Sequence, residues 1–393
     1  MSEWKVLTAE EFCDSVRDGT HDTPRQVECG YKLVTAKHIS NGQIDLSDAY
    51  LISESDYLKI NERSKVERWD VLMSMIGNGL GKSAVVKDNP QYAIKNLALF
   101  KIGDETRAKW LHYYLSSNKG QGFIYNSLQG SGQPFISLSL LRKFPIPVPD
   151  DEKIMRKVVA NLSRYDSLIE NYQKQIKLLE EAAQRLYKEW FVDLHFPGHE
   201  NTKIIDGVPE GWEKKRLSDI ANIIMGQSPK SEFYNTIGDG IPFHQGVGSY
   251  GYRFVDDNVY STSFTRIAEP NSILFSVRAP VGRLNITKNK IVIGRGLASI
   301  NHKTGCQSYL YYLLKEKFFK DNIIGNGAIF ASISKDELYN LVFIIPSDEM
   351  VKRYDAIANK IDKDIQYVDS QIRLLTEARD RLLPKLMSGE IAV

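Results

Sequence analysis

Apolar residues recur at alternating steps of three and four residues in two long segments of the chain. The first segment runs from Ile154 to Trp190, and the second from Val351 to Leu386. The average step of 3.5 residues is the period of a coiled coil, so each segment is predicted to be a long helix with an apolar seam. The residues expected in this seam are Leu162, Ile169, Tyr172, Ile176, Leu179, Leu186, Ile361, Ile365, Val368, Ile372, Leu375 and Leu382.

Both segments begin with signals for a helix N-terminus. The runs Pro149-Asp150-Asp151-Glu152 and Pro346-Ser347-Asp348-Glu349 place a capping Asp or Ser before acidic residues of the first turn. A helix of about 40 residues rises roughly 60 Å. A single helix of that length would expose its seam to water, so the two helices are expected to pair. Arg379 is the one polar interruption, and it stands opposite Ala183 when the two segments are aligned.

Each of the two predicted helices forms the C-terminal part of one copy of a repeated module. The sequence LLEEA at 178–182 recurs as LLTEA at 374–378, and GSGQPFISLS at 130–139 is answered by GNGAIFASIS at 325–334. Repetition over such long segments predicts two similar domains in tandem rather than a solenoid. Tyr113 and Tyr114 match Tyr311 and Tyr312 between the copies, and their helical spacing favours a place in the core.

The globular parts mix helices and strands. Strands are predicted at 273–277 and 291–293, and short helices at 110–116 and 308–319. The polar segment 197–212, rich in Gly and Pro, marks the start of the second module. The expected fold class is α+β, with two similar mixed domains separated by two long antiparallel coiled-coil helices.

The composition argues against several classes of protein. No apolar run approaches the roughly 20 residues of a membrane helix, and the N-terminus lacks the pattern of a signal peptide, so a cytoplasmic protein with no membrane partner is expected. The three cysteines are scattered, and the seven histidines show no metal-binding spacing, so neither a disulfide framework nor a metal site is expected. A net charge of +2 does not by itself suggest a nucleic-acid partner.

Two segments imitate nucleotide-binding motifs. Residues 76–83 end in Gly-Lys-Ser, but Ile76 stands where a phosphate-binding loop begins with glycine. Residues 246–251 match GxGxxG, but a strand-like run rather than a helix follows them. We therefore expect ordinary loops at both places, and no catalytic residues on this chain.

Particular stretches resemble Type I restriction–modification specificity subunits (HsdS). They are 178–198 and 374–393, together with DGTHDTP at 18–24, GQSP at 226–229 and SVRAPVGR at 276–283. The resemblance covers essentially the whole chain. It implies a target-recognition domain at 1–149, a central spacer helix at 150–195, a second recognition domain at 196–346, and a C-terminal spacer helix with its tail at 347–393.

The same resemblance implies partners and cofactors. In this family the two helices pack antiparallel, so that a pseudo-twofold axis relates the halves, and they dock two methyltransferase (HsdM-like) subunits. The complex recruits restriction/motor (HsdR-like) subunits. No cofactor is expected on this chain, whereas S-adenosylmethionine, ATP and Mg are expected on the partners. Tyr187, Lys188 and Phe191, which flank the seam, either face a partner or cap the end of the bundle.

Two recognition domains on a stiff spacer would bind two short DNA segments about one helical turn apart. Because the domains differ in sequence, the double-stranded DNA target is expected to be bipartite and asymmetric. Arg, Lys, Asn and Gln in loops suit base edges, although basic residues also bind phosphates and any of them can be simply solvated. The candidates are Thr20, His21, Thr23, Lys37, His38, Asn78, Lys82, Gln129, Ser131, Gln133, Gln227, Ser228, Lys230, His244, Gln245, Tyr250, Tyr252, Arg253, Arg278, Arg283 and Asn326.

Some alternatives remain open at this stage. The segment Gly294-Arg295-Gly296 departs from the family pattern, and the sequence does not decide whether Arg295 contacts DNA or supports the fold. The chain could also serve a related system in which one partner fuses methyltransferase and nuclease. A third possibility is a helical scaffold whose domains recognise no DNA sequence.

Overall fold

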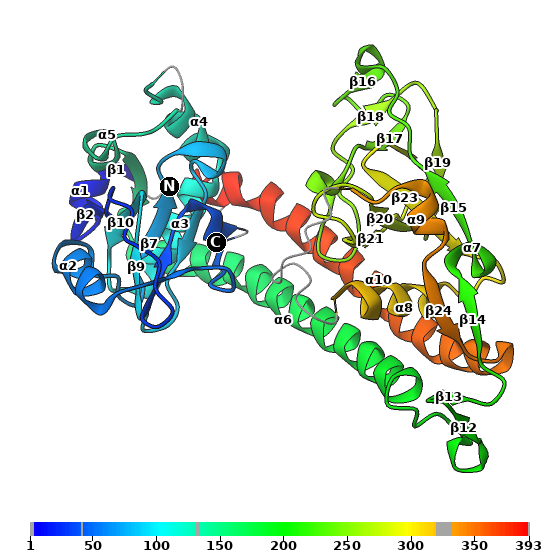
Figure 1. The fold of residues 1–393 in the computed structure, drawn as a ribbon. Helices are drawn as coiled ribbons and strands as arrows, with labels where there is room; N and C mark the ends of the chain where they lie inside the picture. The colour runs from blue at the N-terminus through cyan, green and yellow to red at the C-terminus, as the bar shows by residue number, and fades with distance from the viewer. Residues whose placement is uncertain (1–3, 41, 131–133, 320–331, 392–393) are drawn as a thin grey trace. The chain divides into compact units, whose positions relative to one another are not determined.

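The computed structural model describes residues 4–40, 42–130, 134–319 and 332–391 (Figure 1). The chain divides into two compact units. Unit 1 comprises residues 1–171 and 371–393, and unit 2 comprises residues 172–370. Each unit contains one half of each long helix, because α6 (Glu152–Phe191) and α10 (Asp348–Met387) both cross the division.

Unit 1 is built on a four-stranded antiparallel sheet with the order β2-β10-β7-β8. A smaller sheet of order β6-β3-β9 contains one parallel pair, β3 and β9, and β1 pairs with β11. The strands are β1 (Trp4–Thr8), β2 (Ser15–Asp18), β3 (Tyr31–Val34), β4 (Ile39–Ser40), β5 (Gln43–Ile44), β6 (Leu51–Ile52), β7 (Val71–Ser74), β8 (Ser83–Val85), β9 (Tyr92–Ile94), β10 (Leu97–Lys101) and β11 (Pro145–Pro149).

The central strands of unit 1 are apolar on both faces because both faces are covered. Val71 and Met73 of β7 belong to the cluster that includes Trp110 and Leu111 of α3. Leu72 belongs to the opposite cluster, with side chains of the smaller sheet. Alternate residues of a strand point to opposite faces, so the continuous apolar run of β7 matches its position between two layers. The helices of the unit are α1 (Ala9–Phe12), α2 (Glu54–Ser64), α3 (Glu105–Ser116), α4 (Asn118–Asn126) and α5 (Leu138–Arg142).

Unit 2 repeats this topology. Its main sheet has the order β15-β23-β20-β21, its second sheet contains the parallel pair β17 and β22, and β14 pairs with β24. The predicted tandem repeat of one mixed fold is therefore confirmed. The elements are β12 (Ile204–Ile205), β13 (Val208–Pro209), β14 (Glu213–Arg216), α7 (Leu217–Ile220), β15 (Ala221–Met225), β16 (Tyr234–Asn235), β17 (Ile241–His244), β18 (Tyr260–Ser261), β19 (Ile267–Ala268), β20 (Ile273–Ser276), β21 (Leu284–Ile286), β22 (Ile291–Ile293), β23 (Leu297–His302), α8 (Gln307–Phe319), α9 (Lys335–Tyr339) and β24 (Val342–Ile345).

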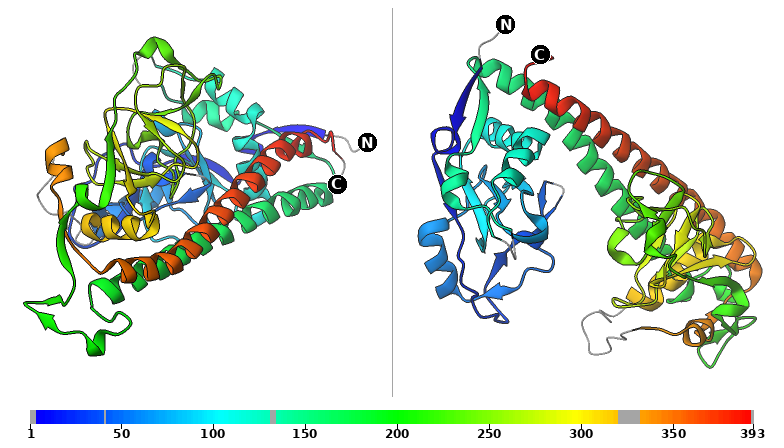
Figure 2. Two further views of the ribbon diagram at one scale, coloured as in Figure 1. Left: turned by 90° about the vertical axis from the view of Figure 1, so that its right-hand side faces the viewer. Right: turned by 90° about the horizontal axis from the view of Figure 1, so that it is seen from above.

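The two long helices pair in each unit (Figure 2). In unit 1, Val158 and Leu162 of α6 share one apolar cluster with Leu383 and Leu386 of α10. In unit 2, the hydroxyl of Tyr354 on α10 donates to the carbonyl of Ala183 on α6 at 2.9 Å. Early residues of each helix thus meet late residues of the other, so the helices run antiparallel, as predicted.

The predicted seam residues are buried or half-buried, and both helix starts show capping contacts. None of the predicted seam residues is exposed, and Ile169 and Ile365 are 8% and 0% exposed. The carboxylate of Asp151 accepts the N–H of Lys153 at 2.9 Å, and the hydroxyl of Ser347 accepts the N–H of Met350 at 3.4 Å. These contacts satisfy N–H groups that a helix cannot pair internally.

The short predicted helices and the core tyrosines are also confirmed. The helix predicted at 110–116 lies within α3, and the one predicted at 308–319 within α8. All four matched tyrosines are at most 7% exposed. Within the described ranges, no helix is long and apolar enough to span a membrane.

Both segments that imitate nucleotide-binding motifs are loops, as expected. Residues 76–82 connect β7 to β8 and include the short 3-10 helix η2 (Gly77–Gly79). Residues 246–251 include the 3-10 helix η5 (Val247–Ser249), and the chain then continues through an isolated bridge between Tyr250 and Val255 rather than into a helix. Neither segment has the strand–loop–helix setting that a nucleotide phosphate needs.

Candidate nucleic-acid interface

Four loops of unit 1 meet at one end of the main sheet. The N–H of Thr20, after β2, donates to the carbonyl of Ile94 at the end of β9 at 3.0 Å. The N–H of Asn96, before β10, donates to the carbonyl of Thr20 at 3.1 Å. The loop after β3 forms η1 (Ala36–His38), which contacts η2 in the loop after β7. Segments distant in sequence therefore bring their polar residues to the same end of the fold.

Side chains bind these loops of unit 1 to one another. The ring of His21 lies 2.9 Å from the amide oxygen of Asn96 through Nδ1 and 3.0 Å from the carboxylate of Asp18 through Nε2. The ammonium of Lys95 donates to the hydroxyl of Thr23. His21 and Thr23 are nevertheless exposed, so the network forms a polar surface rather than a buried core.

A buried histidine, His38, lies in the loop after β3. It is 1% exposed, and its Nδ1 accepts the N–H of Thr35 at 2.8 Å. Its Nε2 lies 3.2 Å from the carboxylate of Asp48, which also accepts from Lys37 at 2.8 Å. Burial lowers the pKa of His38, so the ring is neutral at neutral pH, and its Nδ1 holds the backbone of Thr35. Of the neighbours Lys37 and His38, only Lys37 is exposed.

The corresponding loops of unit 2 meet in the same way. The N–H of Gln227, after β15, donates to the carbonyl of Ile293 at the end of β22 at 2.9 Å. The N–H of Gly296 donates to the carbonyl of Gln245 at 3.1 Å, and the N–H of Val277, after β20, donates to the carbonyl of Gly296 at 2.9 Å. The repeat therefore preserves the junction of the loops as well as the order of the strands.

Unit 2 also has a buried histidine beneath its loops. His244 ends β17 and is 1% exposed. Its Nδ1 lies 2.7 Å from the hydroxyl of Ser249, and its Nε2 lies 3.0 Å from the carboxylate of Asp257. Above it, the hydroxyl of Ser228 donates to the side-chain oxygen of Gln245 at 2.7 Å. Gln245 is exposed, as are Gln227 and Lys230.

The hairpin loops between β7 and β8 and between β20 and β21 complete each junction. Ile76 bridges Phe135, which pairs with Gln129, and in unit 2 Arg278 bridges Ser332. Lys82 and Arg283 are exposed, and each directly precedes the second strand of its hairpin. Most candidates predicted from the sequence are therefore gathered, unit by unit. Ser131, Gln133 and Asn326 lie outside the described residues, as does the side chain of Asn78.

Arg253 is a correction to the sequence-based candidates. It is 2% exposed, and its guanidinium donates to Glu180 of α6 at 2.8 Å and to Asp362 of α10 at 2.6 Å. It also stacks 3.6 Å from the ring centre of Tyr311. A buried guanidinium with two carboxylate partners fixes the interior of unit 2 and is not available to DNA. The neighbouring Tyr252 is exposed but also lies near Glu180. Tyr250 is half-buried, and its side chain packs against an apolar cluster of unit 2.

Equivalent aspartates join each module to the long helices. In unit 1, the hydroxyl of Tyr113 on α3 donates to Asp166 of α6 at 2.5 Å. In unit 2, the hydroxyl of Tyr312 on α8 donates to Asp362 of α10 at 3.0 Å. Arg379 of α10 donates to Asp166 at 2.8 Å. The polar interruption of the seam is thus explained, because Arg379 neutralises a carboxylate that the module needs.

Each unit also has a lysine–carboxylate contact to a long helix, although the two carboxylates are not at equivalent positions of the repeat. Lys87, just after β8, pairs with Glu170 of α6, and Lys288, just after β21, pairs with Asp369 of α10. Neither these contacts nor the tyrosine–aspartate pairs were predicted from the sequence. The recurrence of Asp166 as Asp362 in the aligned helices was the available signal, but their partners lie far away in the chain.

The aromatic residues near the end of α6 are packed within unit 2. Tyr187 is 4% exposed, and its ring lies 5.7 Å from that of Tyr354 and 5.0 Å from that of Phe191. Lys188 is exposed and pairs with Asp193 at 2.5 Å. Of the two interpretations left open by the sequence, the packing favours capping of the helix pair for Tyr187 and Phe191.

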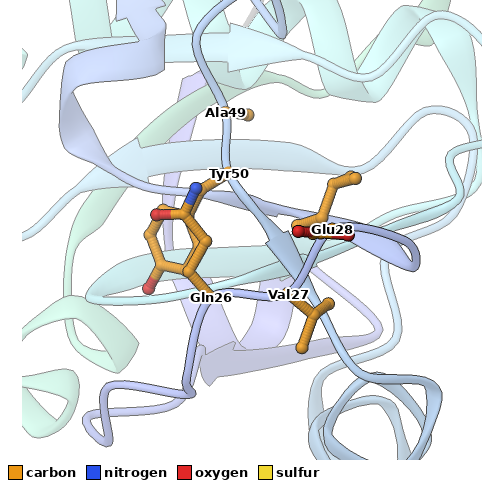
Figure 3. A pocket seen from close by; sticks show the side chains of 6 residues that line it. Gln26, Val27, Glu28, Ala49 and Tyr50 are labelled. Carbon is orange, nitrogen blue, oxygen red and sulfur yellow. The ribbon is translucent and has the colours of Figure 1, made fainter.

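Unit 1 also has an open hollow of about 500 Å³ beside β6 (Figure 3). It is lined by Gln26, Val27, Glu28, Ala49, Tyr50 and Leu51. Glu28 is the one charged residue among these, and its negative carboxylate does not suit a phosphate-bearing cofactor. In the part of the chain that the structure describes, no three His, Cys, Asp or Glu residues are grouped as metal ligands.

The model of the Type I restriction modification DNA specificity domain matches residues 1–181 and 209–379, once for each module. The chain belongs to this family. Specificity subunits are the non-catalytic members of their restriction–modification complexes, and DNA recognition is the role that the family implies.

Relatives of this specificity-domain protein cover most or all of its length. A putative Type I restriction enzyme MjaX specificity subunit from Methanocaldococcus jannaschii is 28% identical, covering 100% of this chain and 94% of the relative. The HindI specificity subunit from Haemophilus influenzae is 23% identical, covering 84% and 88%. The crystal structure of the S subunit from M. genitalium shares the fold, with a TM-score of 0.53 at 16% identity over 98% of this chain and 96% of that one.

Proposed function

We propose that this chain recognises an asymmetric, bipartite DNA target, with one half-site bound by each module. The observation that supports this most is the repeated loop junction. Both units join the same four loops at the same strand ends, but the exposed side chains differ, with His21 and Thr23 in one and Gln227 and Gln245 in the other. One scaffold with different exposed donors and acceptors is suited to two different short sequences.

The long helices would set the distance between the half-sites. Each module is fixed to them by a tyrosine–aspartate hydrogen bond and by a lysine–carboxylate pair. A module held by several contacts has little freedom to pivot, so its loops keep a defined orientation on the spacer. The recognition domains proposed here are residues 1–149 and 196–346, and the spacer helices lie in 150–195 and 347–393.

The outer face of the helices supports the proposed docking of two methyltransferase (HsdM-like) subunits. Leu178 and Leu374 occupy equivalent positions of the repeat, and their side chains are 65% and 52% exposed. Leucines exposed at matched positions suit two copies of one partner. S-adenosylmethionine, ATP and Mg would be bound by the methyltransferase and restriction/motor (HsdR-like) partners.

Mapping of methylated bases in host DNA tests the proposal. Cells that express the methyltransferase with this chain are expected to show methylation at one bipartite motif, and cells without the chain are expected to show none. Unchanged methylation would instead support the scaffold hypothesis. A neighbouring gene that encodes a fused nuclease and methyltransferase would favour the related system with a single partner chain.

A further inference from the structure

One arginine at the loop junction of unit 2 has a position that suits direct base recognition. Arg295 lies between β22 and β23, in the short loop Gly294-Arg295-Gly296. We propose that Arg295 recognises a guanine in the half-site bound by the second module. This inference rests on the proposed function and specifies it by naming a residue and a base.

The loop holds its backbone firmly. The N–H of Gly294 donates to the carbonyl of His244 at 2.8 Å, and the N–H of Gly296 donates to the carbonyl of Gln245 at 3.1 Å. The N–H of Arg295 itself donates to the hydroxyl of Ser228 at 3.2 Å. Three consecutive N–H groups are therefore bonded to two neighbouring loops, so Arg295 projects from an anchored base.

Both flanking residues have to be glycine. A Cβ at Gly294 would lie 2.6 Å from the side-chain oxygen of Gln245, and a Cβ at Gly296 would lie 2.5 Å from the carbonyl oxygen of the same residue. Such contacts are far shorter than van der Waals distances, so the loop packs directly on Gln245. Arg295 is consequently the one side chain that this loop presents.

The guanidinium of Arg295 is exposed, and among the described residues it has no hydrogen-bond or ion-pair partner. This separates it from Arg253 of the same unit, which is buried between two carboxylates. An arginine with free N–H groups can donate two parallel hydrogen bonds to O6 and N7 of guanine, the commonest specific contact in the major groove. The anchored backbone lowers the entropy lost when these bonds form.

The neighbours of Arg295 are also suited to a DNA surface. Gln245 uses its side-chain oxygen to accept from Ser228, and Gln227 and Lys230 are exposed on the adjoining loop. At the equivalent place, unit 1 has Asn96, whose amide oxygen is engaged by His21. The two-residue loop of unit 1, Lys95-Asn96, therefore presents different groups from the loop that carries Arg295, and the half-sites are expected to differ at the matching base pair.

The test replaces Arg295 with alanine in the full chain and maps methylated motifs with the complete methyltransferase complex. The variant is expected to lose its preference at one G·C pair of one half-site, by roughly 5- to 150-fold, with every other position of the motif unchanged. Arg216→Ala is the matched control, because Arg216 is also exposed but lies on β14, away from the loop junction.

Three other results have distinct meanings. An unchanged motif in Arg295→Ala would overturn the assignment. A uniform loss of affinity across all sequences, with a salt dependence reduced by about one unit, would show a phosphate contact instead and would also overturn it. If the unaltered complex methylated no bipartite motif, the proposed function would fail, and the inference would fail with it.

Discussion

At the scale of single residues, burial separates arginines that support the fold from those that can meet a ligand. Arg253 and Arg295 belong to the same unit, but only the second is exposed. Burial alone would lower the pKa of Arg253, but the stacked tyrosine and the nearby carboxylates keep it well above its ordinary value. A guanidinium that remains charged in the interior requires its partners, because an unpaired buried charge is strongly unfavourable.

Replacing Arg253 with methionine is expected to destabilise unit 2 by about 3–5 kcal/mol, because Glu180 and Asp362 would lose their shared cation. Urea unfolding of the full chain would measure the change. Arg381→Met is the matched control. Arg381 pairs with Glu377 on the exposed face of α10, with 79% of its side chain accessible, so a loss of at most about 0.5 kcal/mol is expected. Equal effects in the two variants would contradict the role given to Arg253.

At the scale of elements, the helix pair is the spacer to which each module is attached. Its stability comes from the apolar seam, because helices of this length would otherwise leave a continuous apolar stripe in water. The polar contacts lie at the edges of the seam. Asp166 accepts a hydrogen bond from the tyrosine of unit 1, and Asp362 accepts one from the tyrosine of unit 2. Packing thus holds the helices together, and hydrogen bonds define where the modules sit on them.

Ile169→Asp and Ile365→Asp are each expected to cost several kcal/mol, since each places an unpaired carboxylate in the seam. Co-purification with the methyltransferase should be lost before the modules unfold, and circular dichroism would follow the folding. Leu168→Asp is a control for folding, because Leu168 is the neighbour of Ile169 on α6 but is 45% exposed. A complex that survives both seam substitutions would argue against the paired-helix spacer.

At the scale of the whole molecule, duplication provides two copies of one fold, and we propose that each copy binds one half-site. Each unit has its own sheets, its own core and its own loop junction. Because few of these features depend on the other unit, the loops of one module can change without altering the other. Repetition of the scaffold with divergence of the loops is what an asymmetric target requires.

Exchange of residues 1–149 for the same domain of another family member is expected to change one half-site of the methylated motif and leave the other intact. Sequencing of methylated host DNA would show this directly. The reciprocal exchange of residues 196–346 is the matched control, and it should change only the opposite half. A change in both halves after a single exchange would show that the modules do not act independently.

The sequence alone was sufficient for the repeat, the long helices, their caps and the buried tyrosines. These features follow from the local periodicity of apolar residues and from direct comparison of one half of the sequence with the other. Neither depends on contacts between distant segments. It also indicated most of the loops that meet at the junctions, because polar and glycine-rich residues mark strand ends.

Only the tertiary structure decided how the individual residues of those loops are used. Arg253 looks like any other loop arginine until folding places it between Glu180 and Asp362, which lie far from it in the chain. Arg295 is exposed because Gly294 and Gly296 pack on Gln245 and leave its guanidinium in water. Burial and charge pairing depend on contacts between distant segments, and such contacts have no signature in the local pattern of one sequence.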